Sequence, residues 1–74
     1  MNNEIKEIGI KPPFIKLEQF LKFVGAVSTG GEAKNIILEG LVTVNDEICL
    51  MRGKKLSGGE IVGLKSEFYK VIMG

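Results

Sequence analysis

The chain has 74 residues, a hydrophobic fraction of 45%, a charged fraction of 26% and a formal net charge of +1. This composition is typical of a folded protein, and the length allows one small domain over residues 1–74, too small to enclose a deep active site. No apolar run approaches the roughly 20 residues that span a bilayer, and the N-terminus lacks a signal-peptide pattern. We therefore expect a cytoplasmic protein without a membrane partner.

Residue types that serve catalysis and metal binding are scarce. The chain has no histidine, and its single cysteine, Cys49, cannot form an internal disulfide. Cys49 falls in a strand-like run, so we expect a buried structural thiol. No paired acid–base constellation is visible, and the sequence predicts no enzyme activity, no metal and no cofactor.

The first two elements are a strand and a helix. Residues 4–10 alternate weakly between apolar and polar, which indicates an edge strand, and Lys11-Pro12-Pro13 would end it. The following period is helical and would stop at Gly25. Its apolar stripe consists of Leu17, Phe20, Leu21 and Val24.

A second helix begins after Thr29-Gly30-Gly31-Glu32, which fits a capping box. In such a box the hydroxyl of Thr29 accepts from an early amide, and Glu32 reaches back to the cap. The apolar face is Ala33, Ile36 and Ile37, and Gly40 supplies a left-handed stop. The two apolar helix faces should pack against each other and against the strands that follow.

Four strands complete the predicted order. Residues 42–45 alternate as a strand that enters a turn at Asn45-Asp46, and residues 48–51 would be its return strand. After the basic cluster at 52–55, a Ser57-Gly58-Gly59 turn leads to two further apolar runs, 61–64 and 68–73. The fold class is α+β.

The aromatic residues invite a base-stacking interpretation, but a domain this small needs most of them for its core. Phe20 is a core residue by periodicity. Phe23 and Tyr69 fall off the main apolar stripes, which favours partial exposure, but a structural role is the favoured interpretation of both and base stacking is the alternative.

The cations are clustered although the acids are dispersed. The basic cluster at 52–55 combines three properties that suit a phosphate. The Arg52 guanidinium can make two hydrogen bonds to one phosphate, Lys54 and Lys55 carry mobile charges, and Gly53 lets the backbone come close. A solvated turn that protects a sheet edge is the alternative. Three further lysines could join one positive face on this nearly neutral chain. They are Lys16, Lys22 and Lys34.

The start of the second helix adds a further anion-binding feature. Free amides and the positive end of the helix dipole converge there, and Gly30 and Gly31 leave them uncovered. An ordinary helix cap is the alternative. Together with the cations, this end of the helix favours a surface that holds a phosphate backbone, and hence RNA.

The ordered combination of motifs resembles the S4-type RNA-binding domain, also called the alpha-L fold. The matching segments are Lys16-Leu17-Glu18, Glu32-Ala33-Lys34, Gly40-Leu41-Val42-Thr43-Val44-Asn45 and Gly59-Glu60-Ile61-Val62. Three further segments are similar to those of the small stand-alone bacterial members of the YaaA type. They are Gln19-Phe20-Leu21-Lys22, Thr29-Gly30-Gly31 and Arg52-Gly53-Lys54-Lys55-Leu56. The resemblance implies two short packed helices against a small, mainly antiparallel sheet of four to five strands, with a core motif at 15–64.

The resemblance also implies structured ribosomal or transfer RNA as the partner, in a ribosome-associated monomer that acts with the ribosome or a ribosome-associated protein. The family's RNA contacts fall on the start of the first helix, the turn into the second helix, and the basic loop. In this chain those positions are Lys16, Thr29, Gly30, Gly31, Lys34, Asn35, Arg52, Lys54 and Lys55.

The chain departs from the family pattern at several positions. Lys16 replaces the usual arginine, the turn has no arginine, and Asn45-Asp46 and Gly59-Glu60 stand for Asn-Gly and Gly-Asp. The acidic Asp46 and Glu47 would weaken attraction near the hairpin, so we expect modest affinity.

Two other functions stay open. Beta-grasp sulfur carriers also join a helix to a Val-Asn-x-Glu hairpin, but they end in a flexible Gly-Gly tail, whereas this chain ends at Gly74 after an apolar run. A protein-interaction module without RNA is the second alternative, and affinity for protein rather than RNA would favour it.

Overall fold

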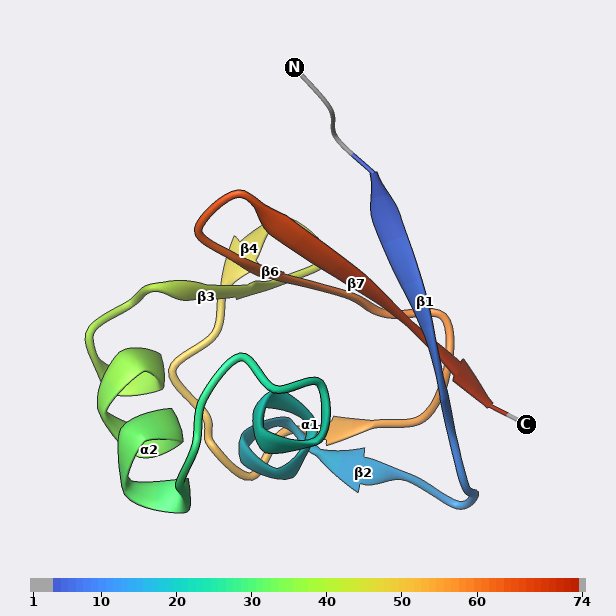
Figure 1. The fold of residues 1–74 in the computed structure, drawn as a ribbon, viewed down its shortest axis with the longest axis horizontal. Helices are drawn as coiled ribbons and strands as arrows, with labels where there is room; N and C mark the ends of the chain where they lie inside the picture. The colour runs from blue at the N-terminus through green and yellow to red at the C-terminus, as the bar shows by residue number, and fades with distance from the viewer. Residues whose placement is uncertain (1–3, 74) are drawn as a thin grey trace.

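The computed structural model describes residues 4–73 and has two helices over a five-stranded sheet (Figure 1). The helices are α1 (Leu17–Phe23) and α2 (Gly30–Leu38). The strands are β1 (Ile5–Ile10), β2 (Ile15–Lys16), β3 (Val42–Val44), β4 (Glu47–Ile48), β5 (Lys55–Leu56), β6 (Ile61–Leu64) and β7 (Glu67–Met73). The predicted α+β class, with two helices and a mainly antiparallel sheet, is confirmed.

The large sheet has the order β1-β7-β6-β3-β4, and β2 and β5 form a separate two-stranded sheet. β1 runs parallel to β7, and the other neighbouring pairs are antiparallel. The helices and the small sheet lie on the same side of the large sheet, with α1 between α2 and β2 (Figure 1).

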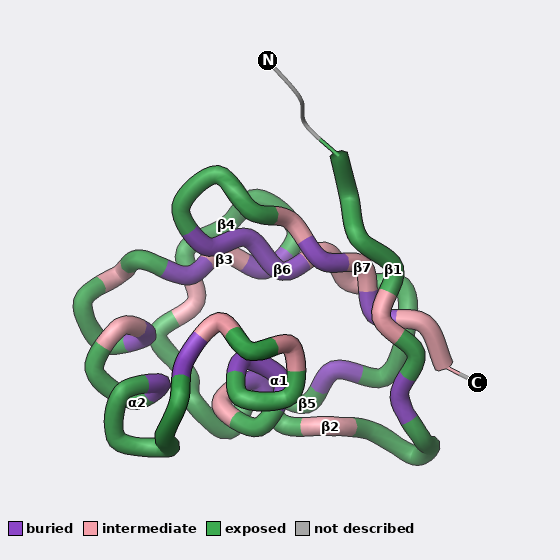
Figure 2. The backbone as a smooth tube through the Cα atoms, in the orientation of Figure 1, coloured by how far each residue is buried: buried purple, intermediate pink, exposed green. Residues whose placement is uncertain are grey.

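The core lies between the helices and the large sheet, and Figure 2 shows buried stretches of the chain in both layers. Leu17, Phe20 and Leu21 on α1 and Ala33 and Ile37 on α2 are fully buried. Val24 and Ile36 are half-buried against the same cluster. The predicted helix faces therefore meet each other and the buried side chains of the sheet in one core.

Both helices stop where the sequence predicted. Gly25 and Gly40 have φ of +80° and +77°, the left-handed region that glycine adopts without strain. β1 also ends before Lys11-Pro12-Pro13, as expected, and it is an edge strand.

Asn45 determines the turn between β3 and β4. Asn45 and Asp46 both have positive φ, +54° and +70°, the pair of left-handed residues that a tight hairpin requires. The Asn45 amide donates to the Ile61 carbonyl at 2.8 Å, and its side-chain oxygen accepts from the Ile61 amide at 3.0 Å. Asn45 thus joins this turn to β6, beyond the turn-forming role predicted for it.

The predicted return strand at 48–51 is wrong in extent. β4 ends at Ile48, and the Cys49 amide makes one more bond to the Val42 carbonyl at 3.0 Å. The chain then leaves the sheet because residues 52–54 are held against the start of α1. The two short strands β2 and β5 were not predicted, since two-residue strands carry no periodic signal.

Two predicted environments also differ in the structure. Tyr69 is buried rather than partly exposed, because alternation along β7 places it with Val71 on the core face. Its ring packs edge to face on Phe20, with centroids 6.2 Å apart. Cys49 packs against the core but is half-buried rather than fully buried. Gly74, on which the sulfur-carrier alternative rests, lies outside the described residues.

Glu60 organises the turn that joins β5 to β6. Its two carboxylate oxygens accept from the amides of Ser57 at 2.9 Å and Gly58 at 2.8 Å. The turn is tied to β7 by the Gly59 amide, which donates to the Val71 carbonyl at 2.7 Å. Partial burial acts to raise the pKa of Glu60, but these hydrogen bonds outweigh it and hold the pKa below its ordinary value.

Leu21→Ala should lower the free energy of unfolding by about 2–5 kcal/mol, because Leu21 is fully buried and the variant leaves a cavity. Leu38→Ala is the matched control, since Leu38 is 55% exposed on α2. Denaturant melting would check both. Equal stability of Leu21→Ala and wild type would show that the core is wrongly assigned.

Glu60→Gln should be less stable than wild type near neutral pH, because a carboxylate with a depressed pKa stabilises the fold above the unfolded pKa of about 4.3. That contribution is lost as pH falls through the folded pKa. The difference in unfolding free energy between wild type and variant should therefore shrink on acidification. A difference that stays constant from about pH 7 to about pH 3 would contradict the assigned role of the carboxylate.

Candidate nucleic-acid interface

The basic loop is joined to the first turn of α1 by backbone hydrogen bonds. The Leu17 amide donates to the Lys54 carbonyl at 2.8 Å, and the Glu18 amide donates to the Arg52 carbonyl at 3.1 Å. The first amides of a helix have no partner within the helix, so the loop satisfies groups that would otherwise need water or an anion. The loop carbonyls face α1, and the start of α1 is not itself an open anion site.

This joint places Lys16 and Lys55 directly opposite each other on β2 and β5. The next pair in the register is Ile15 and Leu56, and Leu56 is fully buried. Because side chains alternate along a strand, the two lysines share the outward face of the small sheet. Like charges at directly opposed positions are destabilising, and a bound anion would relieve the repulsion.

The cations of this region lack acidic partners. Within residues 4–73 the one salt bridge joins Lys6 to Glu67 at 2.9 Å, on β1 and β7. The side chains of Lys16, Arg52, Lys54 and Lys55 are all exposed. We name the following residues the loop cluster: Lys16, Arg52, Gly53, Lys54 and Lys55. Their charges are free to meet phosphates from solution.

Phe14 lies beside this cluster. The Lys55 ammonium lies 4.9 Å from the centroid of the Phe14 ring, which is 36% exposed. A cation over an aromatic face is attracted by the ring quadrupole. The contact holds Lys55 on the outer surface of the small sheet. No periodic signal in the sequence indicated this position of Phe14.

The start of α2 forms the predicted cap, with one difference. The Glu32 amide donates to the Thr29 hydroxyl at 3.1 Å, whereas the Glu32 carboxylate accepts from the amide of Ser28, at 2.9 Å, rather than from that of Thr29. Gly30 and Gly31 are exposed, and no atom lies within 4 Å of a Cβ built on Gly30. The backbone there is open, but the Glu32 carboxylate already lies at the positive end of the helix.

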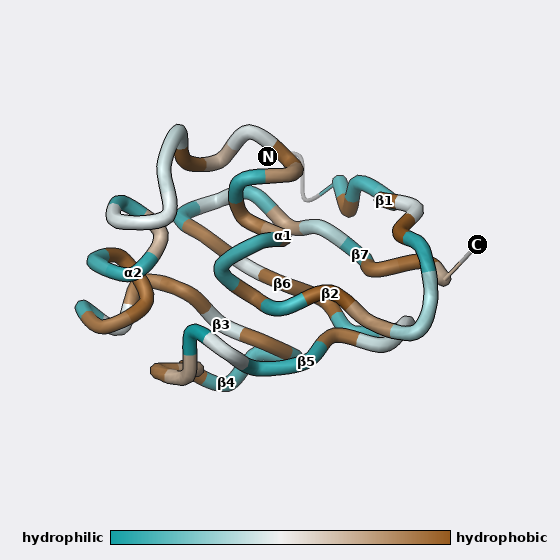
Figure 3. Tube along the Cα trace, turned by 90° about the horizontal axis from the view of Figure 1, so that it is seen from below, coloured by the Kyte–Doolittle hydropathy of each residue, from teal (hydrophilic) through white to brown (hydrophobic). Residues whose placement is uncertain are grey.

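Lys34 and Asn35 follow on α2 and are exposed, and Lys22 is exposed in the last turn of α1. Seen from the helix side, α2, α1 and β2 lie next to one another in that order (Figure 3). The predicted site residues therefore come from adjacent elements on one side of the molecule. The structure brings the loop cluster together directly, and it places the Thr29-to-Asn35 group on the neighbouring helix.

Lys22 borders a shallow hollow that the sequence did not predict. The hollow has a volume of about 470 Å³ and is lined by Ile15, Gln19, Lys22 and Phe23. The side chain of Gln19 also caps α1, because its oxygen accepts from the Lys16 amide at 3.2 Å. Phe23 is 62% exposed, which confirms the expected exposure of this ring.

The acids near the hairpin lie beside one end of the loop cluster, since Glu47 and Lys54 line the same hollow. Asp46 and Glu47 are exposed at the turn into β4, the edge strand of the large sheet opposite β1. No cluster of three or more residues of the types that bind metals occurs within residues 4–73. In the same range no helix is long and apolar enough to cross a bilayer.

The family model for the S4 domain matches residues 8–72, nearly the whole described chain. The chain belongs to the S4 domain family. It is also similar to the probable ribosome maturation protein RlbA of Bacillus subtilis (strain 168), with 41% identity over 58 residues. The match covers 78% of this chain and 82% of that relative. The resemblance read from the motifs is confirmed.

Proposed function

We propose that this protein binds structured RNA of the ribosome through phosphate contacts made by the loop cluster and the start of α2. The observation that carries the proposal is the unneutralised Lys16–Lys55 pair, held opposite each other beside Arg52 and Lys54. A protein without an anionic partner would gain from separating these charges or pairing them with acids. The membership of the S4 domain family and the likeness to a probable ribosome maturation protein support the same partner.

The arrangement favours contact with phosphates rather than with base edges in a groove. The small sheet presents lysines on a short, flat surface, and lysine acts as a mobile point charge. Arg52 can add one bidentate contact. Such contacts orient a protein on RNA without reading its sequence, so recognition of a particular RNA would come from shape. The proposal includes no catalytic step.

The protein-interaction alternative has one observation in its favour. Large apolar side chains are exposed at the junction of α2 with β3 and along β4 and the segment that follows it. They are Leu38, Leu41, Ile48, Leu50 and Met51, each 46–65% exposed. A surface of this kind suits contact with a ribosome-associated protein. Lys54 of the loop cluster lines the same hollow as Ile48, Leu50 and Met51. Arg52 and Lys55 do not line it, so variants at these two positions separate the two functions.

Binding of ribosomal RNA should weaken steeply with salt. If roughly three to five phosphates are neutralised, the logarithm of affinity should fall against the logarithm of salt concentration with a slope of about −2 to −4. Arg52→Glu combined with Lys55→Glu should abolish retention of the RNA, because two attractive charges become repulsive. Filter binding to total ribosomal RNA across a salt series would measure both effects.

The matched control is Lys65→Glu combined with Lys70→Glu, which changes net charge equally on β7 and the turn before it, away from the loop cluster. This control should retain most of the affinity. Circular dichroism and melting curves should show both double variants folded. If the loop variant and wild type give the same binding curves, the loop cluster is not the RNA site.

A further inference from the structure

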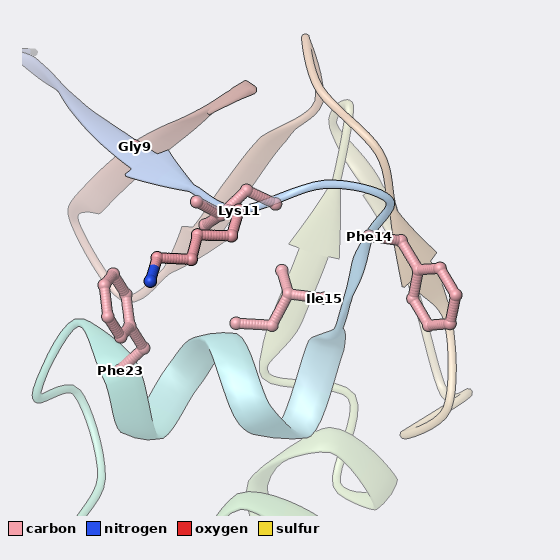
Figure 4. Close-up of a pocket in the computed structure, with 6 residues that line it drawn as sticks. Gly9, Lys11, Phe14, Ile15 and Phe23 are labelled. Atoms are coloured by element: carbon pink, nitrogen blue, oxygen red, sulfur yellow. The ribbon is translucent and has the colours of Figure 1, made fainter. Parts of the chain in front are cut away.

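A second hollow lies where the chain passes from β1 into β2 and crosses the end of α1. Its volume is about 340 Å³, within the range of small-molecule sites, and its lining is mainly apolar (Figure 4). The lining residues are Gly9, Ile10, Lys11, Phe14, Ile15 and Phe23. In Figure 4 Ile15 points into the hollow, Lys11 extends toward Phe23, and the Phe14 ring turns away.

Phe23 separates this hollow from the one beside Lys22. Phe23 and Ile15 line both hollows, one of which also has Lys11 in its lining and the other Lys22. Lys11 and Lys22 are exposed and make no salt bridge within the described part of the chain. The Phe14 ring is already covered on one face by Lys55, whereas Phe23 is 62% exposed. The exposed Phe23 ring therefore borders two hollows, each with one lysine in its lining.

We propose that Phe23 stacks on one unpaired base of the bound RNA, with Lys11 and Lys22 contacting the phosphates on its two sides. The inference rests on the proposed function and specifies its ligand as RNA with an unpaired nucleotide beside a paired stem. A base has an apolar face and carries a negative phosphate on either side, which matches the ring and its two cations. Stacking on aromatic side chains is the general way in which proteins hold unpaired bases.

The position of Phe23 is continuous with the loop cluster. Lys16 precedes α1 and Phe23 ends it, so their backbone positions lie about 10 Å apart along the helix axis. RNA that crosses the helix side of the molecule would meet the loop cluster with its paired backbone and Phe23 with a bulged or terminal base. An apolar protein segment would use Phe23 and Ile15 but would leave Lys11 and Lys22 without partners.

The test compares two synthetic RNA hairpins, one fully paired and one with a single bulged adenosine. Wild type should prefer the bulged hairpin by roughly 5- to 150-fold, the range expected for stacking of one base. Phe23→Leu keeps an apolar side chain but removes the aromatic face, and it should lose this preference while still binding the paired hairpin. Phe23→Tyr should retain the preference, and the salt slope should be unchanged in both variants.

Leu38→Ala serves as the control for loss of an exposed apolar side chain, and it should bind both hairpins as wild type does. A preference for the bulged hairpin that survives in Phe23→Leu would overturn the inference. If that preference survives in Phe23→Leu but is lost in Phe23→Asp, the contact is apolar and does not depend on an aromatic face. If wild type shows no preference but Arg52→Glu with Lys55→Glu releases both hairpins, the stacking site fails and the RNA-binding function stands. Failure of wild type to bind either hairpin would contradict both.

Discussion

The two hydrogen bonds from the Leu17 and Glu18 amides to the Lys54 and Arg52 carbonyls determine how the rest of the site is built. They satisfy the start of α1 with backbone from a segment far along the chain. Because the loop carbonyls face the helix, the loop side chains face solvent. The same contact brings β5 against β2, and this pairing sets Lys16 opposite Lys55. The positive surface is thus a consequence of how a helix end is capped.

Charge on this protein is organised by position rather than by excess. The net charge is +1, yet the loop cluster carries four cations, and the salt bridge within residues 4–73 lies on β1 and β7, away from it. The Asp46–Glu47 pair lies at the opposite edge of the large sheet from β1. A field of this kind orients an anionic partner toward one side of the molecule, while near neutrality limits non-specific attraction. The Glu32 carboxylate at the start of α2 limits it further.

Local sequence signals predicted the elements that depend on local chemistry. The helical stripes, the Thr29 cap and the stops at Gly25 and Gly40 follow from side-chain period and backbone preference, and all are present. The pairing of β2 with β5 has no such signal, because two residues are too few to show a period. The burial of Tyr69 depends on the register of β7 in the sheet, which a single strand does not reveal.

The features of the candidate site also divide into those with a local sequence signal and those without one. The basic cluster and the exposed Phe23 were recognisable in the sequence, since charge density and a break in the helical stripe are local properties. Three other features involve residues that are distant in sequence or carry no pattern. They are the pairing of Lys16 with Lys55, the contact of Lys55 with Phe14, and the hollow lined by Lys11 and Phe23. Only the folded chain shows them.

Ultraviolet crosslinking in cells, with sequencing of the bound RNA and mass spectrometry of the attached peptides, would show which RNA the protein binds and through which residues. If the helix side of the molecule binds ribosomal RNA, this RNA should dominate the crosslinked material and the attached peptides should contain Phe23 or residues 52–55. Recovery of no RNA above background, or crosslinks confined to peptides from β6 and β7, would contradict an RNA-binding surface on the helix side of the molecule.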